Sequence, residues 1–374
     1  MTLEKFTRDF SWLLCASVFF VQVSAAETSV PFDSDKWDIQ AKESKVEEYL
    51  GEKSLFLQDG FAIIKDSDFT DGIIEYDVAF PRQRGFIGSI WRWQNPKNYE
   101  EFYMRPHQSG NPDANQYSPV FNGLDAWQLY YGEGYGAPVR YAFDEWMHIK
   151  IMVSGKNAEI YIRDMDKPAL IVRDMKREIR SGKLGLKGDL APAHFANFSY
   201  VRMENPPLRG KISATGDTPA GTIMSWQVSD SFDEKSLSGK LVLTEDDKKK
   251  LSWKKLTCES TGMANLSKVQ ASEKDKNCVF ARTSIISDKD QIKSLQFGFS
   301  DRIKVYFNDE LIYSGNDTYG SRDYRFLGTM GFFDTLYLHL KKGENKLWVA
   351  VAESFGGWGI QAAFTDAKGI SIKE

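Results

Sequence analysis

The sequence predicts an all-β protein that consists of two antiparallel β-sandwich (jelly-roll) domains after a signal peptide. Segments in which apolar and polar residues alternate, rich in β-branched and aromatic side chains, recur along the chain. Clusters of Gly, Asn, Asp and Pro separate these segments, and the first half shows no helical periodicity longer than a turn or two. Short strands joined mostly by turns are typical of a two-sheet antiparallel sandwich.

Length and composition agree with this fold class. A chain of 374 residues suffices for two ordinary domains. With 42% hydrophobic and 14% aromatic residues, the sequence has the profile of a packed globular protein. The net charge is −4, and the chain has no basic patch of the kind that marks a nucleic-acid binder. We therefore expect no nucleic-acid partner.

The first domain is expected at residues 27–203. Its strands alternate between apolar and polar residues, so that one face of each strand should contact a core. The expected strands span residues 73–80, 86–93, 99–106, 126–132, 145–155, 158–164 and 195–203.

A linker is expected at residues 204–221, because ENPPLRGKISATGDTPAG is rich in proline and glycine and has no apolar periodicity. The second domain would then span residues 222–374. Asn308–Asp309 and Gly343 predict hairpin turns within it. Its expected strands lie at residues 223–232, 277–287, 294–300, 303–315, 335–354 and 358–366.

The N-terminus predicts a secretory signal peptide at residues 1–26. Lys5 and Arg8 precede the apolar run WLLCASVFFVQV, and the small residues SAA follow it. The run is shorter than the ~20 apolar residues that a membrane-spanning helix needs, and no later segment qualifies. We expect a secreted or periplasmic protein without a transmembrane segment, from which Cys15 is removed with the signal peptide.

Two cysteines remain after this cleavage, Cys258 and Cys278. In an oxidising compartment they are expected to form a disulfide, which would contribute about 3 kcal/mol in the chain-entropy model. Two buried free thiols are the alternative. Neither cysteine has a Cys or His neighbour at metal-ligand spacing.

The same segments carry two family resemblances. DGIIEYDVAFP, NYEEFYMRPH, EWMHIKIMVSGKNAEIYI and the closing GKLGLKG and ANFSYVRM resemble the concanavalin A-like, laminin G-like sandwiches of secreted proteins. SDRIKVYFNDELIYSG, LKKGENKLWVAVAESFGGWG and the final Gln-Ala-Ala-Phe strand are similar to galactose-binding-like jelly rolls. The second resemblance implies a module that often accompanies carbohydrate-active enzymes. Both folds host many functions, so neither implies a particular activity.

The segment YEEFYMRPH, residues 99–107, provides the main candidate site. One face of this strand has the apolar character of a core, and the opposite face combines aromatic rings with charged groups, as sugar recognition requires. An exposed strand face with cross-strand ion pairs is the alternative, and a catalytic centre with a histidine base is a third interpretation. The candidate ligand-binding residues of this face are Glu101, Tyr103, Arg105 and His107.

Other segments supply further candidate ligand-binding residues. The preceding strand has an arginine between two tryptophans, and the expected strand at 126–132 has a polar face. In the second half, a glycine-rich segment and a polar loop have the composition of a binding end of a jelly roll. These candidates are Arg92, Gln128, Tyr130, Tyr319, Arg322 and Trp358.

Glu75 and Asp77 raise the question of catalysis. Some glucanases with a concanavalin A-like fold carry a nucleophile and a general acid on one strand, and these two carboxylates share a strand face. Ala79 or Phe80 occupies the position of the third acid, however. Surface carboxylates on an ordinary strand are the alternative, and no catalytic residue is assigned.

No cofactor is assigned with certainty. The histidines are scattered without ligand spacing, so no zinc site is expected. The segment NPDANQY at residues 111–117 leaves calcium open, because Asp and Asn oxygens suit this ion. Turn formation explains the same residues equally well.

These observations favour a secreted protein that binds a glycan or polysaccharide without catalysis. One alternative is a carbohydrate-active hydrolase of the keto-disaccharide hydrolase or glucanase type. The other is an extracellular adhesion protein that binds protein partners.

Overall fold

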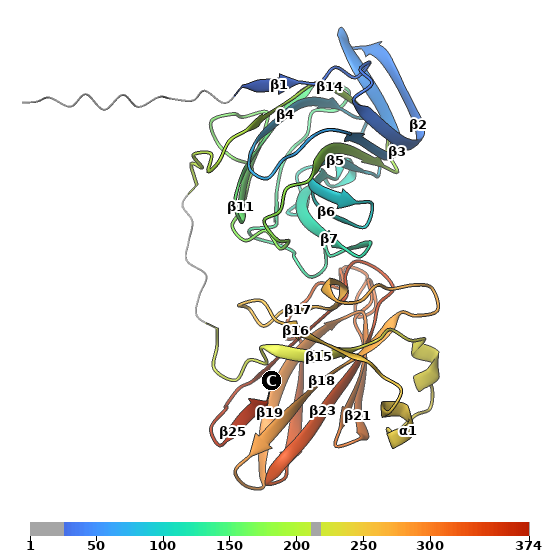
Figure 1. The fold of residues 1–374 in the computed structure, drawn as a ribbon, viewed down its shortest axis with the longest axis vertical. Helices are drawn as coiled ribbons and strands as arrows, with labels where there is room; N and C mark the ends of the chain where they lie inside the picture. The colour runs from blue at the N-terminus through green and yellow to red at the C-terminus, as the bar shows by residue number, and fades with distance from the viewer. Residues whose placement is uncertain (1–25, 211–217, 374) are drawn as a thin grey trace, which may run out of the picture.

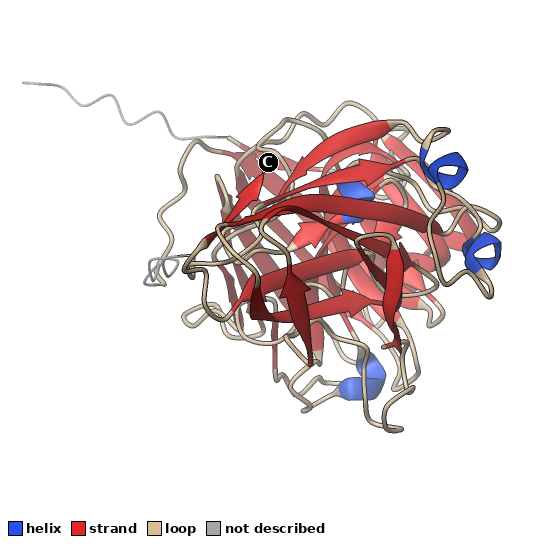
Figure 2. Ribbon diagram, turned by 90° about the horizontal axis from the view of Figure 1, so that it is seen from below, coloured by secondary structure: helices blue, strands red, loops and turns tan. Residues whose placement is uncertain are grey.

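The computed structural model describes residues 26–210 and 218–373, and the regular secondary structure of these residues consists almost entirely of antiparallel strands (Figure 2). The predicted all-β fold class is confirmed. The predicted signal peptide, including Cys15, lies outside the described residues except for Ala26. The few helices are short: η1 (Pro106–Gln108), η2 (Glu234–Leu237), α1 (Glu245–Lys248) and η3 (Leu266–Lys268).

One curled antiparallel sheet forms the first half of the molecule (Figure 1). Its main path is β12-β11-β10-β4-β14-β3-β13-β5-β6-β7-β8. The sheet closes around a core that includes Tyr76, Trp91, Phe102 and Ile151. Its strands are β1 (Glu27–Ser29), β2 (Trp37–Tyr49), β3 (Glu52–Ile64), β4 (Gly72–Ala79), β5 (Phe86–Asn95), β6 (Asn98–Met104), β7 (Asn115–Phe121), β8 (Leu124–Asp125), β9 (Gly136–Ala137), β10 (Met147–Ser154), β11 (Asn157–Ile162), β12 (Leu170–Val172), β13 (Lys183–Asp189) and β14 (Ala193–Arg202).

Two smaller sheets form the second half, with the paths β16-β15-β18-β23-β20-β21 and β17-β24-β19-β22. They enclose a separate core that includes Trp226, Phe297 and Trp358. The predicted turns at Asn308–Asp309 and Gly343 join β20 to β21 and β22 to β23. The strands are β15 (Ser225–Ser229), β16 (Trp253–Thr257), β17 (Ala264–Asn265), β18 (Cys278–Ser287), β19 (Gln291–Ser300), β20 (Arg302–Phe307), β21 (Glu310–Asn316), β22 (Asp334–Leu340), β23 (Gly343–Ala352), β24 (Gly359–Phe364) and β25 (Ile370–Lys373). The boundaries of the predicted domains and linker stay a prediction.

The strand predicted at residues 126–132 is wrong. After β8 the chain turns instead, and the backbone N–H groups of Leu129 and Tyr130 both donate to the carbonyl oxygen of Ala126, at 3.0 and 3.2 Å. Successive side chains in a turn do not alternate between two faces as they do in a strand. The predicted polar face of this segment therefore does not exist.

The predicted disulfide is also wrong, because both thiols are free and buried. Cys258 packs in the core between the two sheets of the second half, whereas Cys278 belongs to a small cluster on the other face of one of them. The backbone N–H groups of the two cysteines donate to the carbonyls of Met224 and Phe232, which flank β15 on opposite sides. The five residues of β15 alone span roughly 13 Å, and a disulfide needs Cα atoms within ~4.4–6.8 Å.

Reduction is therefore expected to leave the stability of the protein unchanged. Dithiothreitol should not shift the midpoint of chemical denaturation, since the folded chain has no S–S bond to lose. A thiol titration of the denatured, unreduced protein should find Cys258 and Cys278 both free. A disulfide would be revealed if Cys258 and Cys278 failed to react in this titration and if reduction lowered the unfolding free energy by about 3 kcal/mol.

Candidate functional site

Gln128 joins the two halves of the molecule. Its backbone N–H donates to the carbonyl of Gly356, and its backbone carbonyl accepts from the N–H of Met330, both at 2.9 Å. Its side-chain Nε2 donates to the carbonyl of Leu327 at 2.7 Å, and its Oε1 accepts from Ser300 Oγ at 3.2 Å. All four polar groups of this fully buried residue thus bond to the second half.

Glycine is required where the loop after β23 reaches this turn. Gly356 has φ = +95°, and a Cβ atom there would lie 2.5 Å from the side-chain amide of Gln128 and 2.7 Å from Trp127 Nε1. Any other residue would push the two halves apart. Within the glycine-rich segment SFGGWG, Gly356 thus allows a close backbone approach.

Tyr130 forms a second connection between the halves. Its hydroxyl donates to Glu259 Oε1 at 2.5 Å, and Lys176 Nζ lies 2.9 Å from Glu259 Oε2. Burial alone would raise the pKa of Glu259, but the ammonium groups of Lys268 and Lys176 hold it below its ordinary value. The carboxylate therefore remains charged within the interface.

A cavity of about 530 Å³ lies where the two halves meet. The first half contributes residues from β5, β6, η1, β8 and β13, together with the turn after β8. The second half contributes only loop residues, from the segments around Tyr319, Leu327 and Glu353–Gly356. The contacts of Gln128 and Gly356 bring these loops against the sheet and so create the cavity.

Arg105 is fixed at one wall of this cavity. Its guanidinium donates to the carbonyl of Asp113 at 2.8 Å, to Tyr103 Oη at 3.1 Å and to Gln116 Oε1 at 2.5 Å. The rings of Tyr103, Phe86 and Trp127 surround it, with centroids 4.9, 5.8 and 5.8 Å from Cζ. A rigid cation among aromatic rings gives this wall both stacking surface and positive charge.

The second half extends the aromatic wall. Phe355 meets Trp127 edge to face at 5.9 Å, and Tyr319 meets Phe355 in the same way at 6.4 Å. Phe355 and Tyr319 remain 53% and 54% exposed, so their rings border the opening of the cavity. The line of rings therefore runs from β5 and β6 across the interface.

Lys187 and Glu101 form a buried ion pair beside these rings, with Nζ and Oε2 2.8 Å apart. Burial raises the pKa of Glu101 to about 7, although the ammonium of Lys187 opposes the rise. Lys187 lines the cavity, whereas Glu101 lies behind it. Glu101 thus acts on the cavity through the lysine that it holds.

His107 lines the same cavity from η1. Burial lowers its pKa, and the neighbouring guanidinium groups of Arg105 and Arg84 lower it further. Its Nδ1 accepts from the N–H of Gly85 at 3.4 Å. The ring is therefore neutral at physiological pH. Because Nδ1 accepts a hydrogen bond, Nε2 is the nitrogen that carries the proton.

The structure brings together half of the predicted ligand-binding residues. Tyr103, Arg105, His107 and Tyr319 line the cavity, and Glu101 lies directly behind it. Gln128 and Tyr130 do not line it, because the turn after β8 directs them into the interface.

Three other predicted residues lie elsewhere. A bulge turns Arg92 inward at φ = +50°, where its guanidinium binds Asp71 and the carbonyls of Thr70 and Gly155. Arg322 is paired with Asp317 and Asp334. Trp358 is fully buried in the core of the second half, where Nε1 donates to a backbone carbonyl at 3.0 Å. None of these three side chains is available to a ligand in the cavity.

Several residues that line the cavity were not predicted from the sequence. Lys187 follows the core residue Leu186 on β13, so strand alternation alone could have placed it on the outer face. Trp127, Phe355 and Glu353 belong to a turn and a loop, where no periodicity indicates which way a side chain points. Their position depends on contact between the two halves.

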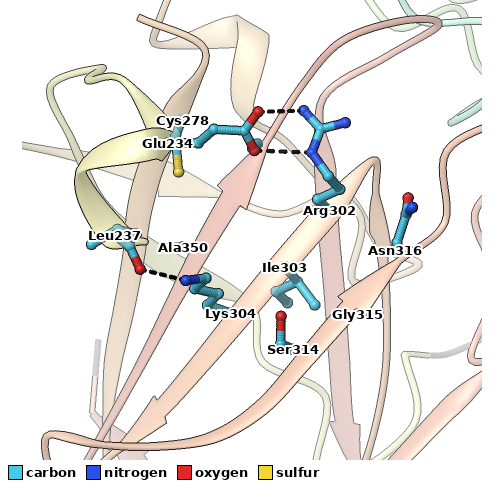
Figure 3. A pocket seen from close by; sticks show the side chains of 11 residues that line it. Glu234, Leu237, Cys278, Arg302, Ile303, Lys304, Ser314, Gly315, Asn316 and Ala350 are labelled. Carbon is cyan, nitrogen blue, oxygen red and sulfur yellow. Dashed lines mark hydrogen bonds and ion pairs between the residues drawn. The ribbon is translucent and has the colours of Figure 1, made fainter. Parts of the chain in front are cut away.

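A second, smaller cavity of about 270 Å³ lies on the outer face of the second half (Figure 3). Its charged groups satisfy one another, because Arg302 binds both carboxylate oxygens of Glu234, at 2.8 and 2.9 Å, and Lys304 donates to the carbonyl of Leu237. Of the described residues that line it, none is aromatic. It therefore provides a ligand with neither the aromatic stacking surface nor the available polar groups of the cavity between the halves.

Glu75 and Asp77 form surface pairs on β4. Lys150 Nζ lies 3.4 Å from Glu75, while His148 and Asn197 bond to Asp77 at 2.7 and 2.8 Å. Neither residue lines the cavity between the halves. The ion pairs agree with the interpretation of this strand as an ordinary one.

The described residues contain neither a cluster of metal-ligating side chains nor a membrane-spanning helix. Within residues 26–210 and 218–373, no group of three or more His, Cys, Asp or Glu residues could hold a metal ion. In the segment that left calcium open, the side-chain amide of Asn111 donates to Gln108 in the turn, and that of Asn115, the first residue of β7, donates to the carbonyl of Ala137. None of the helices described there is long and apolar enough to span a bilayer.

Several solved structures are similar to part of this chain. The carbohydrate binding module CBM66 from Bacillus subtilis is 16% identical, over 44% of this chain and 94% of the module, with a TM-score of 0.32. A protein of unknown function with a galectin-like fold, from the same organism, is 14% identical over 47% of this chain and 96% of its own, at 0.36. A β-glucanase of Bacillus licheniformis is 10% identical over 48% of this chain and 100% of its own, at 0.33. No family model and no curated protein matches the sequence. Similarities this remote do not assign an activity, and the resemblances noted in the sequence stay predictions.

Replacing Gln128 with alanine is expected to loosen the connection between the halves. The change leaves Leu327 O without its buried partner, which costs about 1–3 kcal/mol, and it leaves Ser300 Oγ only its longer contact with Asp301 Oδ1 at 3.5 Å. Thermal unfolding followed by calorimetry should show a lower midpoint or two separated transitions. The control is Gln108→Ala, since this partly exposed glutamine makes only a local contact with Asn111. Equal behaviour of both variants would contradict the role given to Gln128.

Proposed function

We propose that the cavity between the two halves binds an uncharged saccharide, as a carbohydrate-binding protein does. The observation that carries this proposal is the continuous wall of aromatic rings, contributed by both halves, with rigidly held polar groups between them. Sugar rings present apolar C–H faces that stack on aromatic side chains and hydroxyl groups that need donors and acceptors. The volume of about 530 Å³ also falls in the range of about 300–1,000 Å³ that small-ligand sites occupy.

The charges around the cavity favour a neutral ligand. The side chains that line the cavity include three Arg or Lys residues and four Asp or Glu residues, so the lining has no excess of cations. These residues are Arg84, Arg105 and Lys187 on the basic side and Asp113, Asp125, Asp189 and Glu353 on the acidic side. An anionic glycan would need an excess of cations, as sites for phosphate and carboxylate have.

A carbohydrate-active hydrolase is the second candidate. The observation that favours it is a pair of buried carboxyl groups with raised pKa, Glu101 at about 7 and Glu353 at about 8. Glycoside hydrolysis uses a carboxylic acid that still carries its proton near neutral pH. Binding is preferred because Glu101 is held by Lys187 and does not itself line the cavity. With the expected signal peptide, either activity would be exerted outside the cytoplasm.

The proposal predicts that Phe355→Ala weakens saccharide binding. Titration calorimetry of residues 27–374 with neutral hexasaccharides of β-1,4-glucose, β-1,3-glucose and β-1,4-xylose should find at least one ligand. Loss of one stacked ring should lower its affinity about 2- to 12-fold, the equivalent of ~0.5–1.5 kcal/mol. The control is Tyr324→Ala, because this ring is 83% exposed and does not line the cavity.

Three outcomes separate the candidates. Binding that Phe355→Ala weakens and Tyr324→Ala does not, without release of reducing ends, supports a binding protein. Release of reducing ends by the wild-type protein would favour the hydrolase. Failure of every hexasaccharide to bind, or equal effects of both variants, would overturn the proposed site.

A further inference from the structure

Glu353 is a cavity residue that the contacts between the halves leave incompletely bonded. It follows β23 directly, lines the cavity and is only 3% exposed. Its backbone is fixed, because its N–H donates to the carbonyl of Asn277 at 2.8 Å and its carbonyl accepts from Asn277 Nδ2 at 3.3 Å. Of its carboxyl oxygens, Oε1 accepts from the N–H of Gly357 at 3.3 Å, whereas Oε2 is buried and has no hydrogen-bond partner.

The neighbouring Asp301 is the better hydrogen-bonded of the two carboxyl groups. Asp301 Oδ2 accepts from the N–H and the hydroxyl of Ser354, both at 2.7 Å, and from the N–H of Phe355 at 2.9 Å. Three donors stabilise an anion at Asp301, and Glu353 has a single long hydrogen bond. Burial, followed by the charge of Asp301, raises the pKa of Glu353 to about 8, against the opposing effects of the Gly357 N–H and Arg302.

A neutral Glu353 presents an O–H group that needs an acceptor. Leaving a buried donor unsatisfied costs about 1–3 kcal/mol, and Glu353 borders the cavity. We propose that Glu353 donates a hydrogen bond to a hydroxyl, ring or glycosidic oxygen of the bound saccharide, so that the second half takes part in recognition. This inference rests on the proposed function. It names a polar group through which the second half contacts the saccharide, in addition to the aromatic rings of Phe355 and Tyr319.

Other charged groups border the same space, and a test must distinguish their effects on the affinity from that of Glu353. Arg302 and Asp301 approach it from β20 and its preceding turn, and Arg105, Lys187, Asp125 and Asp189 line the cavity from the first half. The pKa of Glu101, behind Lys187, is also raised, to about 7. Because this pKa is close to that of Glu353, and because His107 also lines the cavity, a change of affinity with pH is assigned to Glu353 only where Glu353→Gln abolishes it.

Two substitutions isolate the proposed hydrogen bond. Glu353→Gln keeps the shape and has an amide donor at every pH, and Glu353→Leu removes the donor altogether. The neutral hexasaccharides named above are titrated into the wild-type protein and both variants between pH 6 and 9.5. Because only the protonated acid donates, wild-type affinity should fall as pH rises through about 8. Glu353→Gln should bind within about threefold of wild type at pH 6 and lose this fall, and Glu353→Leu should bind about tenfold more weakly at pH 6.

The outcomes distinguish this inference from the proposed function. If Phe355→Ala weakens binding but Glu353→Leu does not, the cavity binds saccharide and the inference fails. The inference also fails if wild type and Glu353→Gln lose affinity identically above pH 8. If no hexasaccharide binds to the wild-type protein, the proposed function fails and the inference with it. Should Glu353→Leu not fold, as judged by circular dichroism, the comparison of pH profiles between wild type and Glu353→Gln decides alone.

Discussion

The arrangement of the two halves depends on the hydrogen bonds that the buried Gln128 forms across their contact. Burying an amide side chain and a backbone peptide unit without partners would cost several kcal/mol. Gln128 avoids this cost because every one of its polar groups meets a partner from the second half. The same contacts fix the turn after β8, and this turn places Trp127 against the loop that carries Phe355. The aromatic wall is thus a consequence of satisfying one buried glutamine.

The interface combines this neutral network with a charged one. At Tyr130 the two halves share a carboxylate, Glu259, with ammonium groups from both sides. A buried ion pair offers little net stability compared with apolar packing, but removing one partner is costly. The two networks therefore act mainly as determinants of orientation. They allow one arrangement of the loops around the cavity and penalise others.

Sequence reasoning succeeded where a strand packs one face on a core. Such packing forces alternation, so β4, β6 and β10 could be predicted from the chain alone, and the outward face of β6 contains Tyr103 as expected, with Arg105 directly after the strand. Two long strands were not predicted: β2, whose outer part carries mostly exposed polar residues and has no core to impose a period, and β3, although Leu55 and Leu57 of that strand lie in the core. At residues 126–132 the aromatic composition suggested a strand, yet hydrogen bonds to Ala126 impose a turn.

The unpredicted part of the site arises from long-range contacts. Arg92 looked like a surface cation because nothing in the local sequence reveals the bulge that turns it inward. Trp358 stood among glycines, which suggested an exposed platform, although the glycines serve the interface and the indole fills a core. The positions of Glu353 and Phe355 relative to β6 follow only from the packing of one half on the other. Local pattern carries no information about such a distance.

The second half contributes loops to the cavity and no strands, and this division separates evolvable parts from constrained ones. Strand positions in β5, β6 and β13 are tied to the register of a large sheet, so a substitution there disturbs many neighbours. The loops around Tyr319 and Leu327 hold no such register. Insertions or exchanges in them would reshape the mouth of the cavity while the scaffold stays intact. A lineage could therefore diversify its ligand preference by varying one half, and a protein engineer could graft new loops on the same grounds.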